Sequence, residues 1–153
     1  MKIARFENYN LFKSIVDKVH GWSPEDQLLS LFNTAISTKL INNSDILEVG
    51  TWCGRSTISL ASAAKYLNCK VHAIDLFPKK KDWYINPNKN ASFKTKIKNE
   101  LIYGYSDQQV WPKAFQYLID GYKFHNNNDL LKIFTKNLKI FKVDKYVVPY
   151  KAN

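Results

Sequence analysis

Two short apolar runs with a helical pattern between them constrain the fold of this chain more than any other feature. Ile46–Val49 is followed directly by Gly50, and Lys70–Ile74 is followed directly by Asp75. Residues 56–67 carry apolar side chains at helical spacing. A strand, a helix and a strand within about 30 residues predict a βαβ unit with a right-handed crossover. We expect both strands to be buried on both faces.

Further helical patterns lie on both sides of this unit. Residues 8–20 predict an amphipathic helix, and a second one is predicted from Ser23, whose hydroxyl followed by Pro24 is typical of a helix start. Later elements are predicted at Pro112–Asp120 (helix), Asp129–Phe141 (helix) and Tyr146–Tyr150 (third strand). The pattern predicts a Rossmann-like three-layer α/β/α fold with a parallel sheet of at least three strands behind two N-terminal helices.

The chain has 153 residues, a length that fits a single domain. We divide it into residues 1–45 (N-terminal helices), 46–75 (βαβ core), 76–111 (an insertion rich in Lys and aromatic residues) and 112–153 (helices and third strand). Pro78 and Pro87 interrupt any long helix in the insertion, so we expect a surface excursion with some helix there.

The formal net charge of +10 belongs to the second half of the chain. Residues 1–75 carry 8 basic and 7 acidic side chains, whereas residues 76–153 carry 15 and 6. Of the 23 basic residues 21 are Lys, and Arg is the side chain favoured for bidentate contacts with phosphate and guanine. The many Lys, Asn and Ile residues are typical of A- and T-rich coding in a low-GC bacterium or its phage. The charge is therefore weak evidence for a nucleic-acid partner.

Aromatic residues alternate with lysines in the insertion. The aromatic ones are Trp83, Tyr84, Phe93, Tyr103, Tyr105 and Trp111, and the lysines are Lys79, Lys80, Lys81, Lys89, Lys94, Lys96 and Lys98. They fit a lid over a substrate pocket, a subunit interface, an ordinary core with a solvated Lys face, or a surface for single-stranded nucleic acid. The scarcity of Arg favours the lid or the interface.

The apolar runs, the cysteines and the histidines bear on the cellular compartment and on metal binding. No run approaches the roughly 18 apolar residues of a membrane span, so we expect a cytoplasmic protein without a membrane partner. Cys53 and Cys69 are not clustered with histidines at ligand spacing, so no metal site is expected. Cys53 lies near a helix start without a paired base, which favours a filler of the loop over a nucleophile. His72 is interpreted as a packed or partly exposed side chain.

The turn after the first strand carries the residues with functional character. Gly50 and Gly54 are four positions apart, unlike the G-x-G-x-x-G of dinucleotide binders, and no G-K-[ST] of a phosphate loop follows. In a doubly wound sheet ligands bind at such a turn, where the next helix begins. Asp75, 27 positions after Glu48, ends the second strand, where a carboxylate can accept both hydroxyls of a ribose. The pattern predicts a site for a nucleoside cofactor.

The stretch E-V-G-T-W-C-G-R-S, with H-A-I-D-L-F after the next strand, resembles the first two motifs of class I S-adenosylmethionine-dependent methyltransferases. It is most similar to the macrocin-O-methyltransferase and cephalosporin-hydroxylase-like branch. The resemblance is strong over residues 46–77 and fainter over 134–150. The fourth strand of that family, with its acidic residue and D-x-x-H segment, has no counterpart here. The resemblance therefore implies a form truncated relative to the seven-stranded fold.

The resemblance also implies S-adenosylmethionine as the cofactor and a set of residues around it. They are Glu48, Gly50, Thr51, Trp52, Gly54, Ser56, Asp75, Leu76 and Phe77. Glu48 would lie near the methionyl end, Ser56 would cap the next helix and contact the cofactor carboxylate, and Asp75 would hold the ribose hydroxyls. Leu76 and Phe77 would border the adenine, and the loop residues would lie under the cofactor.

The expected function is methyl transfer to a small-molecule acceptor, such as a sugar or another hydroxylated metabolite. No residue is assigned as catalytic base. The alternative is a non-catalytic basic module that binds nucleic acid or another acidic partner on a degenerate methyltransferase fold. An exposed sheet edge would in addition favour a homo-oligomer, because unpaired edges invite association.

Overall fold

The computed structural model describes residues 7–38, 44–87, 91–104 and 129–152. The chain divides into two compact units, which are described separately. The first contains residues 1–75 and 134–150, and the second contains residues 76–133 and 151–153. The helix predicted at Pro112–Asp120 lies outside the described residues.

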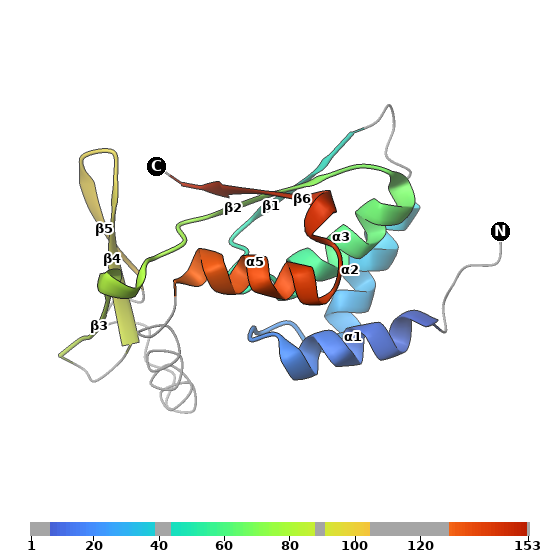
Figure 1. Ribbon diagram of the computed structural model, residues 1–153, viewed down its shortest axis with the longest axis horizontal. Coiled ribbons are helices and arrows are strands. Elements are labelled where there is room, and N and C mark those ends of the chain that lie inside the picture. Colours follow the sequence, from blue (N-terminus) through green and yellow to red (C-terminus); the bar gives the residue numbers. More distant parts are fainter. Residues whose placement is uncertain (1–6, 39–43, 88–90, 105–128, 153) are drawn as a thin grey trace. The chain divides into compact units, whose positions relative to one another are not determined.

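The first unit is built on a three-stranded parallel sheet in the order β1-β2-β6 (Figure 1). Its strands are β1 (Ile46–Val49), β2 (Val71–Asp75) and β6 (Val147–Lys151), the last of which extends into the second unit. Helix α3 (Arg55–Leu67) joins β1 to β2, and Ile46 lies opposite Val71 in the parallel register. The predicted βαβ unit and the third strand are confirmed.

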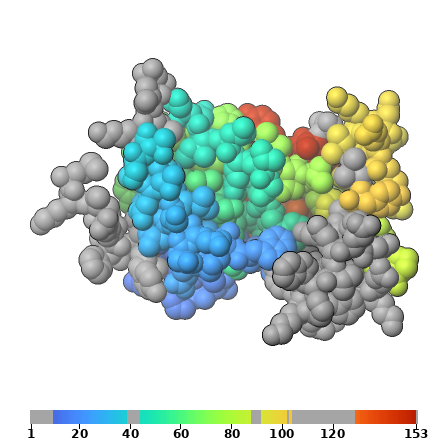
Figure 2. All heavy atoms as spheres, turned by 180° about the vertical axis from the view of Figure 1, so that it is seen from behind, coloured from blue at the N-terminus to red at the C-terminus, as the bar shows by residue number. Residues whose placement is uncertain are grey.

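The helices of the first unit follow the predicted apolar periodicity. They are α1 (Glu7–Lys18), α2 (Glu25–Ser37), and α5 (Leu130–Ile140), of which residues 134–140 belong to this unit. Helix α2 begins one residue later than expected, with Pro24 at its N-cap position. The ring of Phe12 in α1 packs edge to face against the ring of Phe32 in α2, with 5.7 Å between the ring centroids. Figure 2 shows α2 and α3, in blue and blue-green, side by side at the surface. None of the described helices is long and apolar enough to cross a membrane.

One face of the parallel sheet is covered by helices and the other is open at β1. Val71 and Ala73 of β2 are fully buried, whereas Leu47 and Val49 of β1 are 66% and 74% exposed. The expectation that both strands are buried on both faces is therefore wrong for β1. An apolar run cannot distinguish one covered face from two. Among the described residues, the second helical layer of a three-layer arrangement is not found.

The second unit contains an antiparallel sheet where the sequence led us to expect a surface excursion with some helix. Its strands are β3 (Trp83–Ile85), β4 (Ala91–Ile97) and β5 (Glu100–Gly104), in the order β3-β4-β5. The only helical turn described in 76–104 is the 3₁₀ turn η2 (Lys80–Asp82). The expectation failed because the many lysines hid a two-residue alternation in β4, which places Phe93 and Thr95 inside and Lys94 and Lys96 outside.

Candidate functional site

The loop between β1 and α3 adopts a conformation that requires its two glycines. Gly50 and Gly54 have φ angles of 84° and 91°, and Trp52 between them has a φ of 50°. A side chain at Gly54 would meet the ring of Phe134 at 3.1 Å, whereas one at Gly50 would meet nothing within 4 Å. Gly54 is therefore needed for packing as well as for its φ, while Gly50 leaves open space beside the loop.

Asp75 holds this loop against the end of β2. Its Oδ2 atom accepts hydrogen bonds from the backbone N–H groups of Thr51 and Trp52, each at 2.8 Å. Such bonds between a carboxylate and backbone N–H groups are about twice as strong as neutral ones. The sequence placed Asp75 near the loop through the parallel strands, but it did not predict that the carboxylate fixes the loop backbone.

Glu48 is tied to the first turn of α3. The hydroxyls of Ser56 and Thr57 donate to its Oε1 and Oε2 atoms, each at 2.6 Å. Burial raises the pKa of the Glu48 carboxyl above its usual value, against the opposing effect of these two hydrogen bonds. The N-cap of α3 is Gly54, which makes no side-chain cap bond, so the expectation that Ser56 caps this helix is wrong. Ser56 is instead the second helical residue and binds Glu48.

Arg55 has a structural role that sequence reasoning missed. Its guanidinium donates to the carbonyl oxygens of Val19 at 2.7 Å, Val16 at 3.0 Å and Ser23 at 3.1 Å. Val16 and Val19 lie at the C-terminal end of α1, where carbonyls lack helical partners. Arg55 thus fastens the N-terminal helices to the beginning of α3.

Two buried side chains of the loop have different chemical character. Thr51 is 1% exposed, and its Oγ1 atom has no hydrogen-bond partner in the structure. Cys53 is fully buried, and burial raises the pKa of its thiol to about 12. A thiol with such a pKa is protonated at neutral pH, which supports the interpretation of Cys53 as a filler of the loop. Its carbonyl oxygen accepts a hydrogen bond from Nδ2 of Asn137 at 2.9 Å.

The remaining predicted residues are distributed over both units. Glu48, Gly50, Thr51, Trp52, Gly54, Ser56 and Asp75 belong to the first unit, whereas Leu76 and Phe77 belong to the second. Trp52 lies against Trp22, with 5.3 Å between the ring centroids. Among the described residues, no group of three or more His, Cys, Asp and Glu side chains is arranged to hold a metal ion.

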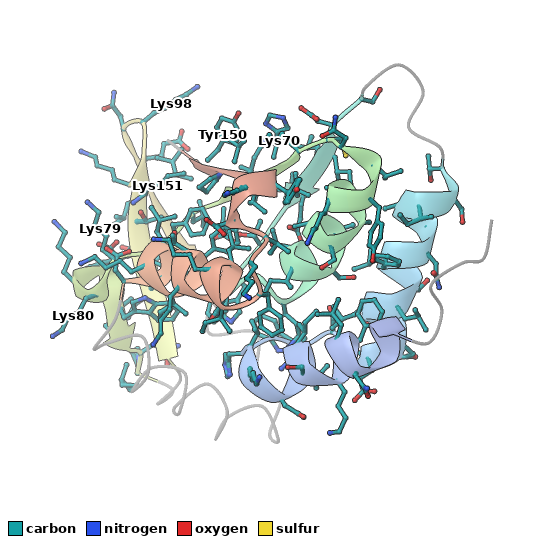
Figure 3. The ribbon with its side chains drawn as sticks, turned by 45° about the vertical axis from the view of Figure 1, so that its right-hand side comes forward. Lys70, Lys79, Lys80, Lys98, Tyr150 and Lys151 are labelled. Atoms are coloured by element: carbon teal, nitrogen blue, oxygen red, sulfur yellow. The ribbon has the colours of Figure 1, made fainter. Side chains whose placement is uncertain are left out.

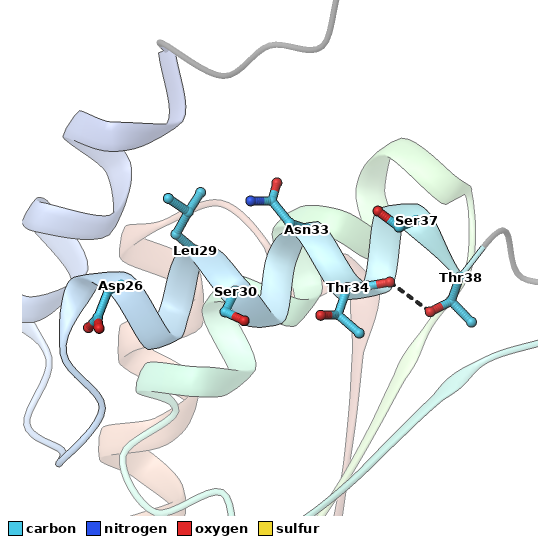
Figure 4. A pocket seen from close by; sticks show the side chains of 7 residues that line it. All are labelled: Asp26, Leu29, Ser30, Asn33, Thr34, Ser37 and Thr38. Atoms are coloured by element: carbon cyan, nitrogen blue, oxygen red, sulfur yellow. Dashed lines mark hydrogen bonds between the residues drawn. The ribbon is translucent and has the colours of Figure 1, made fainter.

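A surface depression along α2 lies apart from these residues in the first unit (Figure 4). It has a volume of about 550 Å³ and is lined by Asp26, Leu29, Ser30, Asn33, Thr34, Ser37 and Thr38. The hydroxyl of Thr38 donates to the carbonyl oxygen of Thr34 at 2.7 Å, the dashed line in Figure 4. Because the depression follows a single helix and contains none of the predicted site residues, we assign no chemistry to it.

His72 joins a polar cluster on the open face of the parallel sheet. Its Nε2 atom lies 2.8 Å from Oδ2 of Asp45, and its Nδ1 atom lies 2.9 Å from the hydroxyl of Tyr150. The hydrogen bond with His72, together with that from the backbone N–H of Lys70, holds the pKa of Asp45 below its usual value. The expectation of a partly exposed histidine is confirmed, but its partners lie too far away in sequence to be predicted.

No protein-family model matches this chain.

Proposed function

We propose that the chain binds S-adenosylmethionine at the carboxyl ends of β1 and β2 and serves methyl transfer to a small-molecule acceptor, such as a sugar or another hydroxylated metabolite. When bound, the cofactor supplies a methyl group activated on a sulfonium. A Rossmann-like three-layer α/β/α fold, truncated relative to the seven-stranded fold of class I methyltransferases, is part of the same proposal.

The observation that carries the proposal is the position of Asp75 beside the loop. A carboxylate accepts several hydrogen bonds, so Asp75 is suited to receive ribose hydroxyls while it holds Thr51 and Trp52. Gly50 leaves open space on the loop, which allows a ligand to approach the backbone closely. The hydroxyl of Thr51 is a buried polar group that a ligand could satisfy.

Glu48 has a more indirect role in this proposal than the sequence resemblance implied. Both of its carboxylate oxygens accept hydroxyl hydrogen bonds from α3. Glu48 therefore positions the start of α3 relative to β1. The N–H groups at this helix start, with the positive end of the helix dipole, favour the carboxylate of the methionyl moiety.

The test is calorimetric titration of the full chain with S-adenosylmethionine and S-adenosylhomocysteine. We expect micromolar binding, weakened about tenfold or more by Asp75→Ala, because hydrogen bonds to a charged partner contribute roughly 1.5 to 3 kcal/mol. Glu48→Ala should also weaken binding about tenfold through the displaced helix start. Asp17→Ala, which removes an exposed carboxylate on α1, is the matched control and should bind as the native chain does.

Two outcomes would contradict the proposal. The first is the absence of binding by a chain whose circular dichroism and thermal unfolding show that it is folded. The second is an affinity that Asp75→Ala leaves unchanged. If binding is found, release of S-adenosylhomocysteine in the presence of hydroxylated acceptors tests methyl transfer directly.

A further inference from the structure

The antiparallel sheet of the second unit has an aromatic core on one side, and its other side is exposed along the hairpin of β4 and β5 but buried at Ser92. Trp83 and Phe93 are buried on the core side, with 5.2 Å between their ring centroids. Pairing and alternation place on the other side Tyr84, Lys94, Lys96, Leu101 and Tyr103. We call these five residues the lysine–tyrosine face. The described aromatic residues of this sheet thus divide into a buried pair, Trp83 and Phe93, and a pair on the other side, of which Tyr103 is exposed and Tyr84 is half-buried.

Exposed apolar and cationic side chains occur together on the lysine–tyrosine face. Lys94 and Lys96 are exposed, Leu101 is 49% exposed and Tyr103 is 56% exposed. Lys98 extends the positive charge at the turn between β4 and β5, where Figure 3 shows it at the tip of the hairpin.

Positive charge on this face has no acidic counterpart on the strands. Among the described residues of β3, β4 and β5, the one carboxylate is that of Glu100. Glu100 is paired with Ile97, and the alternation places both on the side of Phe93. The lysine–tyrosine face is therefore complementary to a negatively charged partner.

The tyrosines lie within reach of the lysines across all three strands. The Nζ atom of Lys94 lies 5.9 Å from the ring centroid of Tyr84, and Lys94 is directly opposite Tyr103 in the register of β4 and β5. Lys96, two residues further, is about 6.8 Å along the strand from Lys94. Lys94 on the central strand therefore has a tyrosine on each neighbouring strand, and Lys96 lies opposite Leu101.

We propose that the lysine–tyrosine face binds single-stranded nucleic acid. The lysine ammonium groups contact backbone phosphates, and unstacked bases lie on the rings of Tyr84 and Tyr103. A duplex keeps its bases stacked on one another and cannot offer them to these rings. Because the ammonium groups contact phosphates and every base has a face that can stack on a tyrosine ring, we expect the binding to tolerate any base sequence. This site is separate from the proposed cofactor site, and its test uses a different ligand.

The test is fluorescence anisotropy of a labelled oligothymidylate of about 15 nucleotides, a length that covers one binding site of this kind. With Lys94, Lys96 and Lys98 in contact with phosphates, log K against log salt concentration is expected to fall with a slope of about −2. The double variant Lys94→Gln/Lys96→Gln should bind more weakly and reduce this slope by about 1.4 in magnitude. Tyr103→Leu should weaken binding about fivefold or more, and Tyr103→Phe should retain it.

Each variant has a matched control in the first unit. Lys18→Gln/Lys65→Gln changes the net charge by the same amount at exposed positions of α1 and α3. Tyr66→Leu removes a tyrosine of α3 that is 62% exposed. Both controls should bind the oligonucleotide as the native chain does. Circular dichroism of every variant verifies that the chain is folded.

Three results would overturn the proposal. The first is that Lys94→Gln/Lys96→Gln and Lys18→Gln/Lys65→Gln weaken oligothymidylate binding equally, which would indicate attraction to the net charge alone. Another is binding of heparin or duplex DNA as tight as that of the oligothymidylate, together with no effect of Tyr103→Leu, which would indicate a general polyanion surface. The third is no binding at low salt.

Discussion

Replacement of Asp75 by alanine is expected to destabilise the first unit, because one carboxylate oxygen holds two successive backbone N–H groups. Oδ2 of Asp75 lies 2.8 Å from the nitrogen atoms of both Thr51 and Trp52. Thr51 is 1% exposed, so water has little access to that residue after the carboxylate is removed. The loss therefore includes the cost of leaving a buried donor without a partner.

The size of the effect follows from the two bonds. Hydrogen bonds to charged groups contribute roughly 1.5 to 3 kcal/mol each, and the lower value for both bonds gives a loss of about 3 kcal/mol for Asp75→Ala. Asp75→Asn keeps one oxygen that can accept both N–H groups but loses the negative charge. Because neutral hydrogen bonds are about half as strong, its expected loss is about 1.5 kcal/mol.

Urea unfolding, followed by tryptophan fluorescence and by circular dichroism, measures this difference. With an m value of about 2 kcal/mol/M, Asp75→Ala should lower the midpoint by about 1.5 M, and Asp75→Asn by about half of that. Coincidence of the two signals is the condition for converting midpoints into free energies, because the chain contains two compact units. An unchanged midpoint in Asp75→Ala would refute the argument that Asp75 holds the loop, and Asp17→Ala supplies the surface control.

Three further predictions concern the loop, its carboxylate and the open sheet face. Gly54→Ala should lower the unfolding free energy by about 1 to 3 kcal/mol, measured by urea unfolding, because φ is 91° and the new Cβ would lie 3.1 Å from the Phe134 ring. Because the pKa of Glu48 is raised in the folded chain, the folded state binds the proton more tightly than the unfolded state does. The unfolding free energy of the native chain, relative to that of Glu48→Gln, should therefore fall as the pH rises from about 4. A difference in unfolding free energy that stays constant between about pH 4 and 7 would contradict this. Leu47 and Val49 are 66% and 74% exposed on an edge strand of the described sheet, so we expect the native chain to self-associate through this strand. Leu47→Lys/Val49→Lys should make the chain monomeric in sedimentation experiments. A native chain that is monomeric at all concentrations would refute this.

The elements that the sequence predicted correctly are those with a clear local period. The apolar spacing in 56–67 and the two flanking runs predicted β1, α3 and β2. The strand at 146–150 was also predicted, within a residue of β6. The hairpin of β4 and β5 was missed although Phe93 and Thr95 alternate with lysines, because an alternation rich in Lys also fits a solvated loop. A search for period-two patterns around the Lys98–Asn99 turn would have found it.

The open face at β1 was decided by tertiary structure alone. The apolar residues 46–49 are typical of a strand covered on both sides, and Leu47 and Val49 are residue types that are commonly buried. Whether a second layer covers them depends on where the helices pack. Figure 3 shows Lys70 and Tyr150 on this open side of the sheet, and the Tyr150 hydroxyl lies 2.9 Å from Nδ1 of His72.

The sequence by itself determined which residues form the loop after β1 and that Asp75 would end the neighbouring strand, because the period of a strand or helix depends on residues only a few positions apart. Only the tertiary structure decided what these residues contact. Asp75 meets the N–H groups of Thr51 and Trp52 across more than twenty residues of chain, and Arg55 meets the end of α1 across more than thirty. Such contacts depend on how the crossover and the N-terminal helices pack, and that packing is a property of the whole chain.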